Sequence, residues 1–113
     1  MRYTIVILLN ATPLWLSKSR AERDEFVNVE LRPVLNHFSA SCKVSLFDSD
    51  FTHAKVSDFM LIETDELETY GLMMGYLRES ATLAAPYFVI QELVVGVANN
   101  FRGSMEIADL RKG

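Results

Sequence analysis

The sequence has few of the residues on which small disulfide-bonded or metal-binding proteins depend. Cysteine occurs once in 113 residues, at Cys42, so an internal disulfide or a paired-cysteine metal clip is excluded. Histidine occurs twice, at His37 and His53. Because the spacing of these residues does not match a metal site, we expect no metal and no other cofactor.

Positive charge is also scarce. Eleven Lys and Arg residues stand against fifteen Asp and Glu residues, which gives a formal net charge of −4, and the basic residues are scattered along the chain. Binding to nucleic acid requires a basic stripe that neutralises phosphates, and a membrane-surface helix requires a basic amphipathic face. The sequence shows neither, so we expect no nucleic-acid and no membrane partner.

Long apolar runs are missing as well. A membrane-spanning helix needs about 20 predominantly apolar residues, and no stretch approaches that length. The first apolar run leads into a proline-containing turn and not into the small-residue cleavage site of a secretory signal. Half of all residues are nevertheless apolar, which is ample for a core. We therefore expect a soluble cytoplasmic protein with one domain.

The apolar pattern predicts elements in the order β-α-β-β-α-β. The predicted strands cover 2–10, 42–48, 56–63 and 86–97, and the predicted helices follow Ser19 and Asp65. Ser19 and Glu22 match a capping box, and Pro33 predicts a kink in the first helix. This order is typical of a ferredoxin-like α+β sandwich with a four-stranded antiparallel sheet of strand order 4-1-3-2. The domain then covers 1–97, and 98–113 form a C-terminal tail that can hold a short helix.

The strand around "TIVILLN" (4–10) is apolar on both of its faces, as is the predicted strand 56–63. Two helices cover one face of the sheet, which leaves an apolar footprint of about 400 Å² on the other. Burying this area is worth about 10 kcal/mol per subunit, which offsets much of an association cost of about 4–15 kcal/mol. We therefore expect a homodimer with two sheets packed face to face, a dimeric α+β barrel. The alternative is that the tail folds over this face.

Several short segments also resemble the darcynin-like family of small bacterial proteins, which have a dimeric α+β barrel fold. The segments are "LLNATPLWL" (8–16), "SRAER" (19–23), "RPVL" (32–35), "FDSDFT" (47–52), "SDF" (57–59) and "APYF" (85–88). The resemblance covers about residues 3–97 and implies the fold, but it implies no activity. The wider barrel class includes cofactor-free monooxygenases and isomerases, so fold alone does not give function.

The strongest candidate for chemistry is "FDSDFTHAK" (47–55), where Asp48 and His53 lie close in sequence. A histidine titrates near neutral pH and a carboxylate fixes its tautomer, so this pair can act as general base and orienter. The alternative is a solvated hairpin loop. A metal site here would need a third ligand such as His37 or Glu63, and the spacing supplies none.

Four further residues are candidates for binding a small apolar ligand: Trp15, Asp58, Tyr70 and Tyr76. Asp58 shares a strand face with apolar residues, so it is either a pocket carboxylate or pairs with a cation such as Lys43 or Arg2. Trp15 either walls a pocket or covers the core beneath its loop. We expect a non-catalytic ligand-binding or assembly role. The alternative is a cofactor-free enzyme of the monooxygenase or isomerase type acting on a small apolar substrate.

Overall fold

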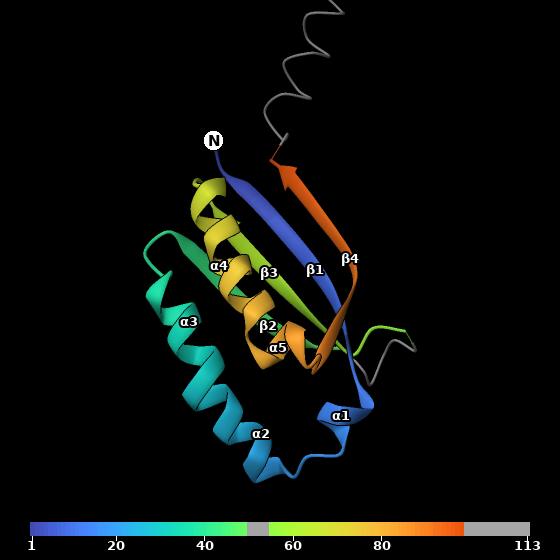
Figure 1. Ribbon diagram of the computed structural model, residues 1–113. Helices are drawn as coiled ribbons and strands as arrows, with labels where there is room; N and C mark the ends of the chain where they lie inside the picture. The colour runs from blue at the N-terminus through green and yellow to red at the C-terminus, as the bar shows by residue number, and fades with distance from the viewer. Residues whose placement is uncertain (50–54, 99–113) are drawn as a thin grey trace, which may run out of the picture.

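A four-stranded antiparallel sheet forms the frame of the protein in the computed structural model, which describes residues 1–49 and 55–98. The strands are β1 (Tyr3–Ala11), β2 (Cys42–Asp48), β3 (Asp58–Thr64) and β4 (Phe88–Val97). Their order across the sheet is β2-β3-β1-β4, with β1 and β3 central (Figure 1). This is the predicted order 4-1-3-2 read from the other edge, so the predicted fold class is confirmed. His53 and residues 99–113 of the tail lie outside the described residues, so the roles predicted for them stay predictions.

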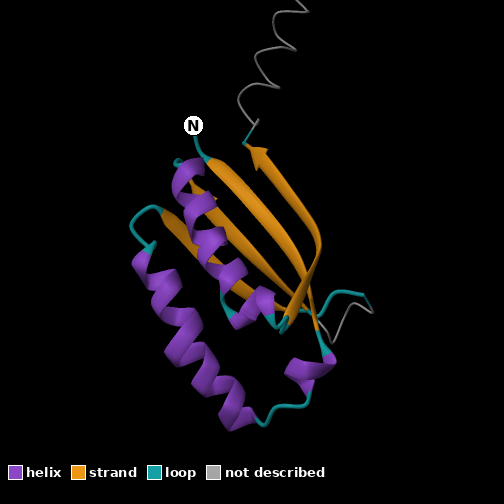
Figure 2. Ribbon diagram, in the orientation of Figure 1, coloured by secondary structure: helices purple, strands orange, loops and turns teal. Residues whose placement is uncertain are grey.

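The helices are gathered on one side of the sheet, where α4 lies roughly along the strands (Figures 1 and 2). They are α1 (Pro13–Leu16), α2 (Arg20–Phe26), α3 (Arg32–His37), α4 (Leu67–Glu79) and α5 (Ala81–Ala84), with a π-helical turn η1 (Val27–Leu31) joining α2 to α3. The predicted capping box at the start of α2 is present, because the Ser19 and Glu22 side chains each accept a backbone N–H of the other residue. The short helices α1 and α5 lie in segments between the predicted elements, where the sequence predicted neither a helix nor a strand.

The long first helix changes its hydrogen-bond register where a proline kink was predicted. The Arg32 N–H donates to the Val27 carbonyl, five residues earlier, and this bond closes the π turn. Pro33 lies in the first turn of the following segment, α3, where a missing N–H is tolerated.

The core lies between the sheet and the helices. Ile5, Ile62 and Met73 are completely buried, and Leu77 is 1% exposed. Thr64 belongs to this layer and is also fully buried, and its hydroxyl donates to the Ser41 carbonyl at 2.8 Å. The strands that contribute Ile5 and Ile62 are adjacent in the sheet, so their inward side chains form one continuous apolar floor under α4.

The opposite face of the sheet is apolar and has no helix over it in the part of the chain that the structure describes. Val6 pairs with Leu61 on one side and Val94 on the other, and Leu8 pairs with Phe59. Phe59 in turn stacks on its β2 neighbour, with ring centroids 4.7 Å apart and an interplanar angle of 15°. We call this surface the open face, defined by Val6, Leu8, Phe47, Phe59, Leu61 and Val94.

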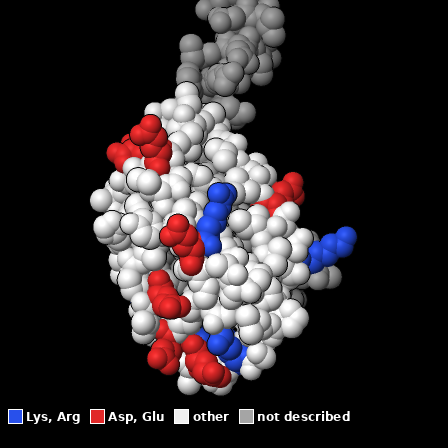
Figure 3. All heavy atoms as spheres, viewed as in Figure 1, with Lys and Arg blue, Asp and Glu red and all other residues white. Residues whose placement is uncertain are grey.

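Figure 3 shows charged side chains of both signs spread over the helical face, with acidic groups along the long helix formed by α2, η1 and α3. On the open face, Glu63 lies 3.8 Å from Arg2 and 3.9 Å from Lys43 at one end, and Glu92 of β4 is paired with Leu8. Across residues 1–49 and 55–98, no helix has both the length and the apolar character required to cross a membrane.

Candidate functional site

An apolar cavity of about 190 Å³ lies between the sheet and the long helix formed by α2, η1 and α3, which we call the first long helix. We call it the inner cavity. Leu9 and Met60 line it from the sheet, and Phe26 and Leu31 line it from α2 and η1. Trp15, Asp58, Thr82 and Phe88 complete its polar and aromatic parts. Two of the residues predicted to bind a ligand, Trp15 and Asp58, therefore meet at one cavity, although 43 positions separate them in the sequence.

The short helix α1 places Trp15 at this cavity. Thr12 caps the helix because its hydroxyl accepts the Trp15 N–H at 3.3 Å, and Pro13 occupies the first helical turn. The Thr12 N–H donates to the Tyr87 carbonyl at 2.9 Å, which ties α1 to the segment before β4. Trp15 is thus held by a capped helical turn and not by a loose loop.

Aromatic rings pack around Trp15. Its ring centroid lies 5.6 Å from that of Phe26 and 5.1 Å from that of Phe88, and Tyr87 contacts both Trp15 and Phe26. Arg23 lies over the outer side of the Trp15 ring, with its guanidinium carbon 5.8 Å from the centroid. Trp15 therefore packs among aromatic side chains beneath α1 and also lines the inner cavity.

Asp58 is half-buried at the start of β3, on the strand face that also carries Met60 and Ile62. The backbone around it is fixed, because the Ser57 N–H donates to the Leu9 carbonyl at 3.0 Å. Burial raises the pKa of the Asp58 carboxyl above 3.8, the hydrogen bond from Ser57 opposes this, and the charge of Asp48 adds to the rise. Asp58 and Asp48 are directly paired in the sheet register.

The cations that were candidate partners of Asp58 lie elsewhere. Arg2 and Lys43 both lie beside Glu63, whose side chain is on the open face. Successive residues of a strand point to opposite faces, so Asp58 and Glu63 are on different sides of the sheet. The expected pairing of Asp58 with Lys43 or Arg2 is therefore wrong, and Asp58 is a cavity carboxylate.

The raised pKa of Asp58 predicts how stability depends on pH. The folded protein holds this proton more tightly than the unfolded chain, so ionisation of Asp58 removes stability as the pH rises through its folded pKa. The variant Asp58→Asn cannot ionise. We expect it to melt higher than the wild type at pH 7, by on the order of 2 °C because a half-buried group is partly solvated. The difference should vanish as the pH falls toward 3.8.

Thermal unfolding followed by circular dichroism at pH 7 and pH 4 measures this effect. Asp65→Asn is the matched control, because Asp65 is exposed beyond the opposite end of β3. A lower melting temperature for Asp58→Asn than for wild type at pH 7 contradicts the assignment of Asp58 as a carboxylate penalised by burial.

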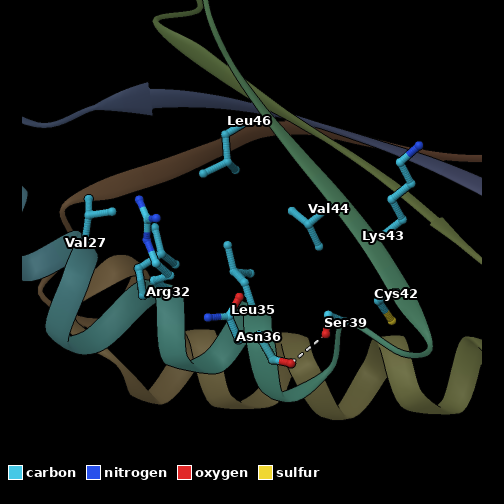
Figure 4. Close-up of a pocket in the computed structure, with 10 residues that line it drawn as sticks. Val27, Arg32, Leu35, Asn36, Ser39, Cys42, Lys43, Val44 and Leu46 are labelled. Carbon is cyan, nitrogen blue, oxygen red and sulfur yellow. Dashed lines mark hydrogen bonds between the residues drawn. The ribbon is translucent and has the colours of Figure 1, made fainter.

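A larger and more open groove of about 440 Å³ lies beside the inner cavity, between the first long helix and the edge strand β2 (Figure 4). Val27, Leu31 and Leu46 line both spaces, so the groove adjoins the cavity. In the close-up, Leu46 and Val44 from β2 face Val27 and Leu35 from the helix across the groove. The π turn thus provides side chains to both spaces, which fits the frequent occurrence of such turns at functional sites.

The other predicted site residues that the structure describes, Asp48, Tyr70 and Tyr76, are not in the lining of the inner cavity. Asp48 is exposed at the end of β2. Tyr70 is half-buried and packs against the core, and the pKa of its hydroxyl is raised mainly by this burial. Tyr76 is exposed and its ring centroid lies 5.8 Å from that of Phe38. His53, the predicted base, lies outside the described residues, and the part of the chain that is described holds no cluster of three or more His, Cys, Asp or Glu suited to a metal.

Phe26, Thr82 and Phe88 are among the lining residues that were not identified as site residues from the sequence. Phe26 occupies an apolar position of the first helix, and such positions usually belong to a core. Thr82 lies in "SATLAAP" (80–86), where Ser80 caps α5 by accepting the Thr82 N–H at 3.3 Å. A serine two residues before Thr82 was the available signal for this helix.

The sheet order, the helices on one face and the cavity between the two layers define a ferredoxin-like α+β protein. In agreement, the chain resembles the structure of chlorite dismutase from Candidatus Nitrospira defluvii in complex with imidazole, with a TM-score of 0.74 at 11% identity. The match covers 86% of this chain and 40% of that protein, so the chain spans about two fifths of its length. At this identity the likeness shows the fold alone.

Residues 2–109 match the family model of Darcynin, a domain of unknown function, and the chain belongs to this family. A Darcynin homolog from Streptomyces avermitilis is 26% identical over 87% of this chain and 80% of its own length. Another from Granulibacter bethesdensis is 28% identical over 87% and 78%, and Darcynin 1 from Acinetobacter baumannii is 27% identical over 76% and 94%. The predicted family resemblance is confirmed, and these relatives are bacterial.

Proposed function

We propose that the protein is a non-catalytic, homodimeric small-ligand-binding protein. Each subunit holds one apolar ligand in the inner cavity, and two subunits associate through their open faces. The two sides of the sheet then have different occupants. The observation that carries the ligand-binding role is the cavity itself, which brings Trp15 and Asp58 together beneath the first helix.

The composition of the cavity supports binding of an apolar molecule. Ligand sites are typically concave and apolar, with a small number of polar groups that orient the ligand. Here the polar side chains are Asp58 and Thr82, and the remaining lining side chains are apolar or aromatic. The adjoining groove provides a route of entry from the β2 edge.

The open face supports self-association. Val94 is 54% exposed and Phe47 is 43% exposed, although both are large apolar side chains. An apolar sheet surface of about 400 Å² is comparable to the largest apolar patch of a typical monomer and often marks an interface. Two copies related by a two-fold axis present identical patches to each other, so each subunit buries the same surface.

A fluorescence titration tests the ligand-binding role, because Trp15 is the sole tryptophan of the sequence and lines the cavity. Excitation of Trp15 during addition of small one-ring compounds should give a saturable change with one site per chain. The compounds should be recovered chemically unchanged after prolonged incubation. If none gives a saturable change, the cavity is not a ligand site. Conversion of a compound would instead support a cofactor-free enzyme.

A further inference from the structure

The inner cavity has the size and the walls to hold a single aromatic ring. Its volume is about 190 Å³, and a smaller apolar cavity of about 150 Å³ is sufficient to bind benzene. The additional space accommodates a short substituent on the ring. Trp15, Phe26 and Phe88 supply aromatic walls, and aromatic pairs add attraction beyond the area that they bury.

The lining of this cavity carries a carboxylate, and the Arg23 guanidinium lies behind one of its walls, 5.8 Å from the centroid of the Trp15 ring. Among the described residues that line it, Asp58 is the ionisable one. Its neighbour across the strand pair is Asp48, a second carboxylate, and the cations Arg2 and Lys43 lie beside Glu63 on the other side of the sheet. A half-buried carboxylate next to another carboxylate is stabilised by a positive charge and destabilised by a further negative one.

The other polar side chain in the lining of the cavity is Thr82. Thr82 is 7% exposed, and its hydroxyl oxygen is buried without a hydrogen-bond partner in the described part of the chain. Leaving a buried hydroxyl unpaired costs about 1–3 kcal/mol. Threonine side chains in helices populate two rotamers, so a turn about χ1 exchanges the positions of hydroxyl and methyl. A ligand with N–H donors would supply the missing partner.

We propose that the inner cavity binds an arylalkylamine, a primary amine joined to one aromatic ring by a short linker. The ring lies among Trp15, Phe26 and Phe88, and the ammonium group donates to the Asp58 carboxylate and the Thr82 hydroxyl. The walls give affinity for the ring, and Asp58 gives selectivity for a cationic head group. This inference rests on the proposed ligand-binding function and adds the chemical class of the ligand.

Three probes of nearly equal shape test the proposal: benzylamine, benzyl alcohol and ethylbenzene. They differ in a terminal ammonium, hydroxyl or methyl group. In Trp15 fluorescence titrations of the full chain at pH 7, we expect benzylamine to bind at least about tenfold more tightly than benzyl alcohol, because a hydrogen bond to an ionised group is stronger than a neutral one. Ethylbenzene should bind more weakly than benzylamine.

Two isosteric variants separate the contributions of the polar groups. Asp58→Asn should weaken benzylamine binding about tenfold and leave ethylbenzene binding unchanged, because it removes the charge and keeps the shape. Thr82→Val should weaken both benzylamine and benzyl alcohol severalfold and leave ethylbenzene unchanged. Asp65→Asn is the matched control, since it removes one negative charge at an exposed position outside the cavity. Circular dichroism checks that each variant is folded.

The outcomes distinguish this inference from the function on which it rests. If ethylbenzene binds saturably and benzylamine binds no more tightly than benzyl alcohol to the wild type, the amine assignment is overturned and the ligand-binding function stands. Equal loss of benzylamine affinity in Asp58→Asn and Asp65→Asn also overturns it, because the attraction would then be due to net charge. If none of the three probes binds, both proposals fail together.

Discussion

If the protein forms the proposed dimer, Leu61→Glu is expected to convert it into a monomer. Leu61 lies at the centre of the open face, where it pairs with Val6 of β1 and Ser45 of β2. In a two-fold symmetric dimer, the substitution puts one carboxylate from each subunit into the same apolar interface. An unpaired charge buried in this way costs about 3–5 kcal/mol, so the dissociation constant should rise by at least a factor of about 100. Sedimentation velocity at micromolar concentration measures the change.

Leu72→Glu is the matched control for this variant. Leu72 is 62% exposed on α4, on the helical side of the sheet. Its substitution introduces the same glutamate away from the open face. We expect Leu72→Glu to sediment as the wild type does. If Leu61→Glu and Leu72→Glu both keep the wild-type dimer, the subunits associate through a different surface and the open face has another role.

Ile62→Ala is expected to cause the largest loss of folding stability. Ile62 has no exposed surface and lies between Ile5 and Val44 in neighbouring strands, beneath the helices. Truncation to alanine leaves a cavity in a packed layer and should lower the free energy of unfolding by about 2–5 kcal/mol. For a domain of this size, the melting temperature should fall by on the order of 10 °C or more. Urea unfolding followed by circular dichroism measures the loss.

The neighbouring variant Leu61→Ala separates the two faces of the sheet. Ile62 packs within one subunit, so its contribution should not depend on protein concentration. Leu61 packs against the second subunit in our account, so the effect of Leu61→Ala on unfolding should depend on concentration, as expected when folding and association are linked. A loss below about 1 kcal/mol for Ile62→Ala would contradict the assignment of the core to the helical side of the sheet.

The sheet could be predicted from the sequence because its pattern is unambiguous. The strand Tyr3–Ala11 is apolar on both faces, and the central strand Asp58–Thr64 is nearly so, which placed both in the middle of the sheet. The capping box at Ser19 gave the start of α2 to within one residue. These are local signals, and they agree with the fold.

The short helix α1 could not be predicted from "ATPLWLS" (11–17), because a proline is usually read as the end of regular structure. Pro13 breaks a helix interior but suits the first turn, and Thr12 provides the cap. The start of α4 also depends on a contact outside the helix. Its N-cap is Glu66, and the hydroxyl of Thr64 accepts the Glu66 N–H at 3.0 Å. Thr64 is fixed in the core by the adjacent strand, which sequence alone does not show.

The candidate site was predicted in part. Trp15 and Asp58 were identified as ligand-binding residues and line the same cavity, but the sequence could not show that they meet. Their meeting depends on the pairing of β1 with β3 and on the anchoring of Thr12 to Tyr87, which are long-range contacts. Thr82 was missed because an isolated threonine between Ala81 and Leu83 carries no signal of chemistry until its burial is known.

Our central claim is that the two sides of the sheet are covered by different molecules, a small ligand beneath the helices and a second subunit on the open face. Native mass spectrometry of protein purified from its host measures both together. The account predicts a species of twice 12.8 kDa that carries additional small masses, up to one per chain. A single species of 12.8 kDa with no added mass, at micromolar concentration, would contradict it.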